Sequence, residues 1–181
     1  MTRRKLFNEE LNRKTISDFR RAGKLPLVIV LDNVRSLNNI GSVFRTADAF
    51  LVNSIYLCGI TATPPHRDIQ KTALGATESV DWKYFDRTAG AVTELKSMNY
   101  EIISLEQTEA SIPLTGFQPE KQKKYAMVFG NEVKGVDQIV IDMSDSCIEI
   151  PQYGTKHSFN IAVSAGIVLW DFFTKLRPEG L

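Results

Sequence analysis

Residues 27–51, LVIVLDNVRSLNNIGSVFRTADAFL, decide the fold. The first six, Leu27 to Asp32, are apolar up to the final aspartate and rich in branched side chains, which is typical of a strand buried on both faces of a parallel sheet. A polar loop follows, and from Ile40 to Leu51 the apolar side chains recur at helical spacing. This order of strand, loop and amphipathic helix predicts the first unit of an α/β domain with a mostly parallel sheet.

The same alternation continues along the chain. Further strands are expected at residues 54–58, 80–85, 101–105, 125–130 and 147–150, and helices around residues 69–74, 91–98 and 158–176 and before Met143. Ser158 is the expected N-cap of the last helix. Residues 106–124 are polar, lack periodicity and predict a long loop. We therefore expect one α/β domain, residues 26–181, behind a basic N-terminal extension, residues 1–25.

Composition and length limit the class of protein. A chain of 181 residues with 43% hydrophobic and 24% charged residues is typical of one globular domain with its own core. No apolar run approaches the ~20 residues that span a bilayer, and no apolar segment follows the charged N-terminus, so we expect a cytoplasmic protein with no membrane role. Cys58 and Cys147 each lie in an apolar run, which predicts buried thiols and neither a disulfide nor a metal site.

Charge is distributed unevenly along the chain. The net charge is +1, but residues 1–24 hold eight basic against three acidic side chains, or +5, whereas the remainder holds 14 basic and 18 acidic side chains, or −4. Cations near a polyanion release its counterions, so the extension is a candidate phosphate-binding arm. A solvated helical extension is the alternative.

Three loops are expected at the carboxyl ends of strands, where open parallel sheets bind ligands. They are residues 33–45, residues 130–135 (GNEVKG) and residues 150–160 (IPQYGTKHSFN), and they are rich in amides and glycines. No GxGxxG follows the first strand and no GxxxxGK[ST] occurs, which disfavours a dinucleotide enzyme or a phosphate-loop NTPase. Such loops suit an adenosine-like ligand held by backbone groups. From these residues alone, we infer an α/β enzyme that binds a small ligand.

The three loops resemble, in order and position, the motifs of the SpoU (TrmH-like) branch of the SPOUT methyltransferases. The first motif is similar to LDNVRSLNNIGSVFRTADAF, the second to MVFGNEVKG and the third to IEIPQYGTKHSFNIAVSAGIVLW. The resemblance implies a C-terminal deep trefoil knot and S-adenosylmethionine as methyl donor. It also implies methyl transfer to a ribose 2′-hydroxyl of RNA, and a homodimer whose site is completed between subunits. A compact chain with a basic extension resembles the tRNA-modifying members more than those acting on rRNA.

The resemblance assigns roles to matching positions. It implies catalytic roles for Arg45, Asn39, Glu132, Ser158 and Asn160. Because a guanidinium is a poor base, we expect Arg45 to bind the phosphate beside the target ribose and to stabilise the developing alkoxide. Glu132 is expected to bind a hydroxyl or to pair with Arg45. The RNA-binding candidates are Arg3, Arg4, Lys5, Arg20, Arg21 and Arg45.

The donor is expected to lie against the second and third motif loops and the segment after the strand at residues 101–105. The candidate contacts are Ser104, Leu105, Glu106, Gly130, Asn131, Gly135, Ile150, Pro151, Gly154, Ser158, Phe159 and Asn160. Structural roles compete with these assignments: core packing for Ile150 and Phe159, a turn for Gly135 and a helix cap for Ser158. Phe159 stands where the family often has leucine and is expected to narrow the pocket.

Several interpretations stay open. Neither His66 nor His157 is assigned a catalytic role. A SPOUT enzyme that methylates a base would carry similar motifs. A catalytically silent RNA-binding or ribosome-assembly module would also keep the fold, although the joint presence of the five polar motif residues argues against it.

Overall fold

Strand β1 (Leu25–Asp32) lies between β2 (Val52–Cys58) and β6 (Lys124–Phe129) in the computed structural model, which describes residues 3–176. The sheet has seven strands in the order β3-β2-β1-β6-β4-β7-β5, and every neighbouring pair is parallel. The remaining strands are β3 (Asp81–Phe85), β4 (Tyr100–Leu105), β5 (Ile112–Pro113) and β7 (Ser146–Glu149). The predicted parallel α/β architecture is confirmed.

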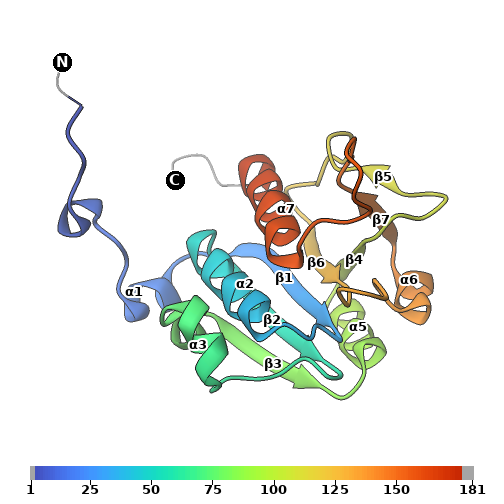
Figure 1. Ribbon diagram of the computed structural model, residues 1–181, viewed down its shortest axis with the longest axis horizontal. Coiled ribbons are helices and arrows are strands. Elements are labelled where there is room, and N and C mark those ends of the chain that lie inside the picture. The colour runs from blue at the N-terminus through green and yellow to red at the C-terminus, as the bar shows by residue number, and fades with distance from the viewer. Residues whose placement is uncertain (1–2, 177–181) are drawn as a thin grey trace.

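Helices cover both faces of this sheet. Helices α2 (Leu37–Ala49), α3 (Arg67–Ala73) and α7 (Ile161–Leu176) lie on one face, and α5 (Thr88–Ser97) and α6 (Gln138–Met143) lie on the other (Figure 1). A short helix, α4 (Ala76–Ser79), precedes β3. Alternate residues of β1 contribute to two separate core clusters, with Leu27, Ile29 and Leu31 in one and Val28 and Val30 in the other. The continuous apolar character of β1 follows from this double coverage.

Helix α2 begins earlier than predicted. The Ser36 side chain accepts a hydrogen bond from the Asn39 backbone N–H at 3.3 Å and caps the helix, so Asn38 and Asn39 lie in the first turn of α2. The first motif loop is therefore short, and the Asn39 side chain projects from a helix, which holds it more rigidly than a loop.

Helix α7 begins later than predicted. The Asn160 Oδ1 atom accepts hydrogen bonds from the backbone N–H groups of Ala162 (2.9 Å) and Val163 (3.4 Å), so Asn160 caps the helix. The prediction that Ser158 is the cap was wrong. Residues 157–160 form neither a helix nor a strand.

Helix α7 has apolar residues on two sides. The buried side is formed by Ile161, Ser164, Ala165, Val168, Leu169, Phe172 and Leu176. The sequence places Val163, Ile167 and Trp170 at helical spacing on one apolar stripe, and these side chains are 50%, 36% and 58% exposed. The stripe is thus largely an outward, apolar surface, and Phe172 belongs to the core.

The long segment between β4 and β6 wraps against the C-terminal part of the chain. The Leu114 backbone N–H donates to the Glu149 carbonyl at the end of β7 (2.8 Å). The Lys175 Nζ atom near the end of α7 donates to the carbonyl oxygen of Phe117 (2.7 Å), and the Phe117 and Phe172 rings stack with centroids 5.6 Å apart. Residues 106–124, predicted as a loop, thus contact the end of β7 and the C-terminal half of α7; β5 is a two-residue strand within them, and Lys124 begins β6.

The N-terminal segment has an anchored part and a projecting part. Helix α1 (Ile16–Arg21) is capped by Thr15 and docks through the buried Phe19, and the Arg20 guanidinium donates to the Glu78 carbonyl (2.7 Å). Residues 3–15, with the 3-10 helix η1 (Asn8–Leu11), extend away from the body (Figure 1). The basic segment is therefore partly a piece of the domain and partly an arm.

Two further expectations concern the chain as a whole. Over residues 3–176 the structure contains no helix with the length and apolar character that crossing a bilayer requires. Both cysteines are free: Cys58 is buried, as predicted, and burial raises the pKa of its thiol to about 12. Cys147 is only half-buried, because β7 lies near the edge of the sheet.

Candidate active site

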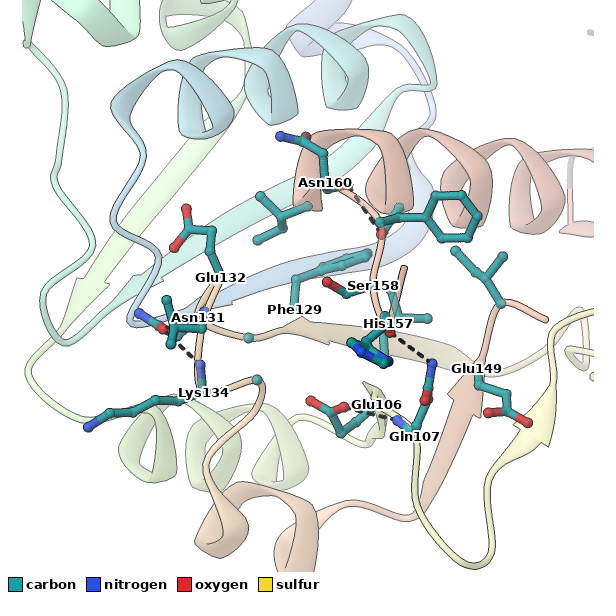
Figure 2. A pocket seen from close by; sticks show the side chains of 18 of the residues that line it. Glu106, Gln107, Phe129, Asn131, Glu132, Lys134, Glu149, His157, Ser158 and Asn160 are labelled. Atoms are coloured by element: carbon teal, nitrogen blue, oxygen red, sulfur yellow. Dashed lines mark hydrogen bonds between the residues drawn. The ribbon is translucent and has the colours of Figure 1, made fainter. Parts of the chain in front are cut away.

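A cavity of about 550 Å³ lies at the carboxyl ends of β4, β6 and β7, beside the start of α7 (Figure 2). This volume is in the range of small-molecule sites, and the position is where parallel sheets bind ligands. Residues from four segments form its wall: 105–107; 129–135; 149, 150 and 152; and 157–161 with 164. The second and third motif loops therefore meet at one cavity, and the segment after β4 joins them.

The turn between β6 and α6 depends on two glycines. Asn131 and Gly135 form an isolated antiparallel bridge, and Gly135 has a φ of +71°, which glycine adopts most readily. A Cβ atom on Gly130 would lie 2.1 Å from the carbonyl carbon of Gly135. The close approach that Gly130 permits is thus to its own turn, and Gly135 is both a turn residue and part of the cavity wall.

Asn131 organises this turn. Its Oδ1 atom accepts hydrogen bonds from the backbone N–H groups of Val133 (2.9 Å) and Lys134 (3.1 Å), and its Nδ2 atom donates to the Asn33 carbonyl (2.8 Å). Figure 2 shows the Lys134 side chain directed away from the cavity. The second motif is therefore tied to the first through the Asn131 amide.

Glu132 makes a second tie between these motifs. Its carboxylate accepts hydrogen bonds from the backbone N–H groups of Arg35 (3.1 Å) and Ser36 (3.0 Å) and from Asn39 Nδ2 (3.4 Å). Partial burial would raise the pKa of this carboxyl, but these hydrogen bonds outweigh burial and lower the pKa below 4.5. Glu132 is therefore ionised at neutral pH and fixed in place by these hydrogen bonds.

The third motif joins the same network through Asn160. Its Nδ2 atom donates to Asn39 Oδ1 at 3.1 Å, while its Oδ1 atom caps α7. Glu132 and Asn160 both line the cavity, and Asn39, which does not line it, is hydrogen-bonded to both. Three polar residues from three distant motifs thus meet at one edge of the cavity.

Most predicted donor contacts lie on the cavity wall. They are Leu105, Glu106, Gly130, Asn131, Gly135, Ile150, Ser158, Phe159 and Asn160. Three lie outside it. Ser104 is buried and shares a hydrogen bond with Ser144 (2.7 Å), Pro151 is half-buried outside the wall, and a Cβ on Gly154 would meet open space.

Arg45 stands apart from this cavity. It is exposed on α2 and is not among the cavity-lining residues. In the described part of the chain Glu132 forms no ion pair with it, since the Glu132 carboxylate binds the start of α2 instead. The expected pairing of Glu132 with Arg45 is absent from this structure.

Other cavity residues were missed from the sequence. Gln107, Glu149, Gln152, His157 and Ser164 contribute to the wall. The Gln107 Nε2 atom donates to the His157 carbonyl (3.4 Å), and the His157 side chain points into the cavity (Figure 2). The available signal for His157 was its place within the third motif, next to Ser158. Nothing in the local pattern singled out Gln107.

The described residues contain no group of three or more His, Cys, Asp or Glu side chains arranged to hold a metal ion.

The predicted RNA-binding residues of the N-terminal segment differ in their surroundings. Arg4 forms a bidentate pair with Glu10 (2.6 and 3.0 Å), and Arg21 pairs with Asp18 (2.7 Å). Arg3 and Lys5 are exposed.

Residues 26–170 match the sequence profile of the SpoU rRNA Methylase family. The chain belongs to this family. The 23S rRNA (guanosine-2'-O-)-methyltransferase RlmB of Neisseria meningitidis serogroup B is 31% identical over 144 residues, which are 80% of this chain and 56% of that protein. RlmB of Nitrosomonas europaea is 32% identical over 81% of this chain and 55% of its own length. The chain thus spans little more than half the length of these relatives.

Solved structures of the family have the same fold. The A. aeolicus TrmH/SpoU tRNA modifying enzyme superposes with a TM-score of 0.77 at 23% identity, covering 88% of this chain and 81% of that one. The AdoMet-bound rRNA methyltransferase from Sinorhizobium meliloti gives a TM-score of 0.78 at 22% identity, covering 88% and 61%. The chain therefore has the fold of these SpoU/TrmH enzymes.

Proposed function

We propose that this SpoU family protein transfers a methyl group from S-adenosylmethionine to a ribose 2′-hydroxyl of RNA and acts as a homodimer. The observation that carries the proposal is the hydrogen-bonded set Glu132–Asn39–Asn160 at the edge of the cavity. A polar edge beside a cavity of small-molecule size places groups that orient a hydroxyl next to a bound donor. The names of the relatives in both comparisons agree with RNA as substrate.

The cavity fits the donor in size and chemistry. Apolar side chains of Leu105, Phe129, Ile150 and Phe159 suit the adenine ring, and the tight Gly130–Gly135 turn presents backbone groups to the same space. Phe159 is 41% exposed and forms part of the mouth, so its size narrows the entrance without filling the cavity. When bound, the donor supplies an electrophilic methyl group that an oxygen attacks in line.

The residues at the edge of the cavity position the acceptor. Asn160 and Ser158 offer hydrogen-bonding groups to the ribose, and Glu132 keeps Asn39 and the start of α2 in place. Because its two oxygens already accept three hydrogen bonds, Glu132 is assigned the role of orienting its neighbours. The hydroxyl proton passes to solvent while a cation stabilises the alkoxide.

A second copy of the chain supplies this cation. Arg45 is exposed and outside the cavity of its own chain, and α2 packs beside α7, whose Val163, Ile167 and Trp170 form an exposed apolar face. Burying this face between two copies removes it from water and brings Arg45 of each copy to the cavity of the other. The guanidinium then binds the phosphate beside the target ribose.

The RNA is proposed to contact the projecting arm as well. Arg3 and Lys5 are exposed there, whereas Arg4 and Arg21 are paired with carboxylates and contribute less net charge. Arg20 is anchored to the body. We propose tRNA as the first substrate to test, because a compact domain with a basic arm suits a small folded RNA. Ribosomal RNA is the alternative.

The reaction is tested with donor carrying a labelled methyl group and separate pools of tRNA and rRNA, followed by nuclease digestion and nucleoside analysis. Label in 2′-O-methyl nucleosides supports the proposal, whereas label in a base indicates a base methyltransferase. Titration calorimetry with S-adenosylmethionine separates both from a silent RNA-binding module, which would bind RNA and release no heat with the donor.

The shared site is tested by mixing Arg45→Ala with Asn160→Ala subunits. Each variant alone is expected to be nearly inactive. If Arg45 acts across the interface, every mixed dimer contains one complete site, and random 1:1 mixing restores about a quarter of the wild-type rate. No restoration would show that Arg45 acts within its own chain or not at all.

A further inference from the structure

The register of the sheet places two carboxylates on either side of Gly130. Phe129 of β6 is paired with Leu31 of β1 and with Leu105 of β4. The residues that follow these three are Gly130, Asp32 and Glu106. Two acidic side chains therefore leave neighbouring strands at the same level, one on each flank of the glycine that opens the second motif turn.

Both carboxylates bind the returning limb of that turn. The Val136 backbone N–H donates to Glu106 Oε2 (2.9 Å), and the next N–H, that of Asp137, donates to Asp32 Oδ2 (2.9 Å). Consecutive amides are thus held by carboxylates from opposite sides. Because a Cβ on Gly130 would lie 2.2 Å from Val136 N, the limb also lies directly on Gly130.

Asp32 differs from Glu106 in its surroundings. Glu106 lines the cavity, whereas Asp32 does not line it and is 1% exposed, the only Asp, Glu, Lys or Arg among the described residues that is buried. Asp32 Oδ1 accepts hydrogen bonds from Asn33 Nδ2 (2.8 Å) and Thr88 Oγ1. A buried carboxylate is costly unless it is fully hydrogen-bonded, so its position is strongly determined by these partners.

We propose that Asp32 is a positioning residue for methyl-donor binding, which acts by fixing residues 135–137 against Gly130 and so setting the wall of the cavity. Asp32 ties this limb to β1 and to the start of α5, while Glu106 ties it to β4 from within the cavity. The inference rests on the proposed function, since it assigns the cavity to the donor.

The test compares Asp32→Asn with Asp145→Asn. In Asp32→Asn one oxygen becomes an N–H donor that faces other donors. Asp145 is the control for hydrogen bonding. Its carboxylate, although exposed, also accepts a backbone N–H, that of Ile102 (2.7 Å), and a side-chain donor, Lys96 (2.9 Å), and forms no hydrogen bond with residues 130–137. Calorimetry measures S-adenosylhomocysteine binding, denaturant unfolding measures stability, and amide hydrogen exchange follows residues 131–137.

Asp32→Asn is expected to weaken S-adenosylhomocysteine binding about tenfold or more and to speed exchange in residues 131–137. Asp145→Asn is expected to lose stability with unchanged affinity. Unchanged affinity in Asp32→Asn, or equal weakening in both variants, would overturn the inference. If Asp32→Asn does not fold, Thr88→Val, which removes one donor to the same carboxylate, is measured in its place under the same criteria.

Failure of the proposed function would look different. A wild-type protein that binds neither S-adenosylmethionine nor S-adenosylhomocysteine would contradict the donor assignment. Amide exchange in residues 131–137 needs no ligand, so the effect of Asp32 on the turn stays measurable in that case. If amide exchange is then faster in Asp32→Asn and not in Asp145→Asn, Asp32 still positions the turn, but the cavity does not bind the methyl donor.

Discussion

The side chains of Asn39 and Asn160 share a hydrogen bond of 3.1 Å, although 121 positions separate them in the chain. Asn39 lies in the first turn of α2 and Asn160 caps α7, so the bond joins the starts of two helices that pack on the same face of the sheet. Each amide also has a second partner, because Asn39 donates to Glu132 and Asn160 caps its helix. At this edge of the cavity, each of the two side-chain amides therefore uses both its oxygen and its nitrogen in hydrogen bonds.

Asn160→Asp separates capping from bridging. An aspartate still caps α7, so the free energy of unfolding should change by less than about 0.5 kcal/mol, whereas Asn160→Ala should lose about 1 kcal/mol. The aspartate cannot donate a hydrogen bond to Asn39 Oδ1. The Asn39 side chain then lies between two carboxylates, Glu132 and the new aspartate, and has a single amide group to donate to them. Methyl transfer should fall about tenfold or more in both variants. Wild-type activity in Asn160→Asp would mean that capping is the whole role of Asn160.

The carboxyl of Glu132 predicts a specific pH dependence of stability. Burial alone would raise its pKa, but the hydrogen bonds from Arg35, Ser36 and Asn39 outweigh burial and lower the folded-state pKa from 4.5. The resulting stabilisation is complete above the unfolded pKa and is lost as the pH falls through the lower folded pKa. Denaturant unfolding of the wild type and Glu132→Gln should therefore differ by a constant amount at neutral pH and converge in acid. Convergence on raising the pH would contradict the assignment.

Gly130→Ala should disrupt the second motif turn. Its Cβ would meet the Gly135 carbonyl carbon at 2.1 Å, and backbone atoms cannot move aside as a flexible side chain can. We expect a loss of about 2 kcal/mol in stability and no detectable donor binding, measured by denaturation and calorimetry. Gly154→Ala is the control, because nothing lies within 4 Å of its Cβ position, and it should behave as wild type.

Ile167→Lys tests the outward face of α7. Ile167 is 36% exposed beside Val163 and Trp170, so a lysine there should leave the monomer folded while preventing two copies from burying this face. Sedimentation velocity should show a monomer, and methyl transfer should be lost. The matched variant Ile139→Lys, on the 62% exposed Ile139 of α6, should stay dimeric and active. A monomeric wild type at micromolar concentration would refute the dimer.

Local pattern predicted most elements of the sheet but not every end. The strand at residues 27–32 and the helix after it follow from runs whose periodicity is set by burial on one or two sides. The predicted first residues of α2 and α7 were wrong, because the start of a helix depends on which side chain accepts a hydrogen bond from its first free N–H groups. Ser36 does so at α2, and Asn160 does so at α7 instead of Ser158. Helix α7 carries apolar residues on both of its sides, so the local pattern alone does not distinguish its buried side from its exposed side.

The sequence by itself determined the α/β class, the family and two loops of the cavity wall, because motif spacing and strand burial are recorded in consecutive residues. The third loop expected there, residues 33–45, does not line the cavity. Only the tertiary structure decided that Asp32 supports the second motif turn, that His157 faces the cavity and that Arg45 lies outside it. These relations join segments distant in the chain. They depend on strand order, register and the passage of residues 150–160 along the sheet edge, which no local pattern of side chains encodes.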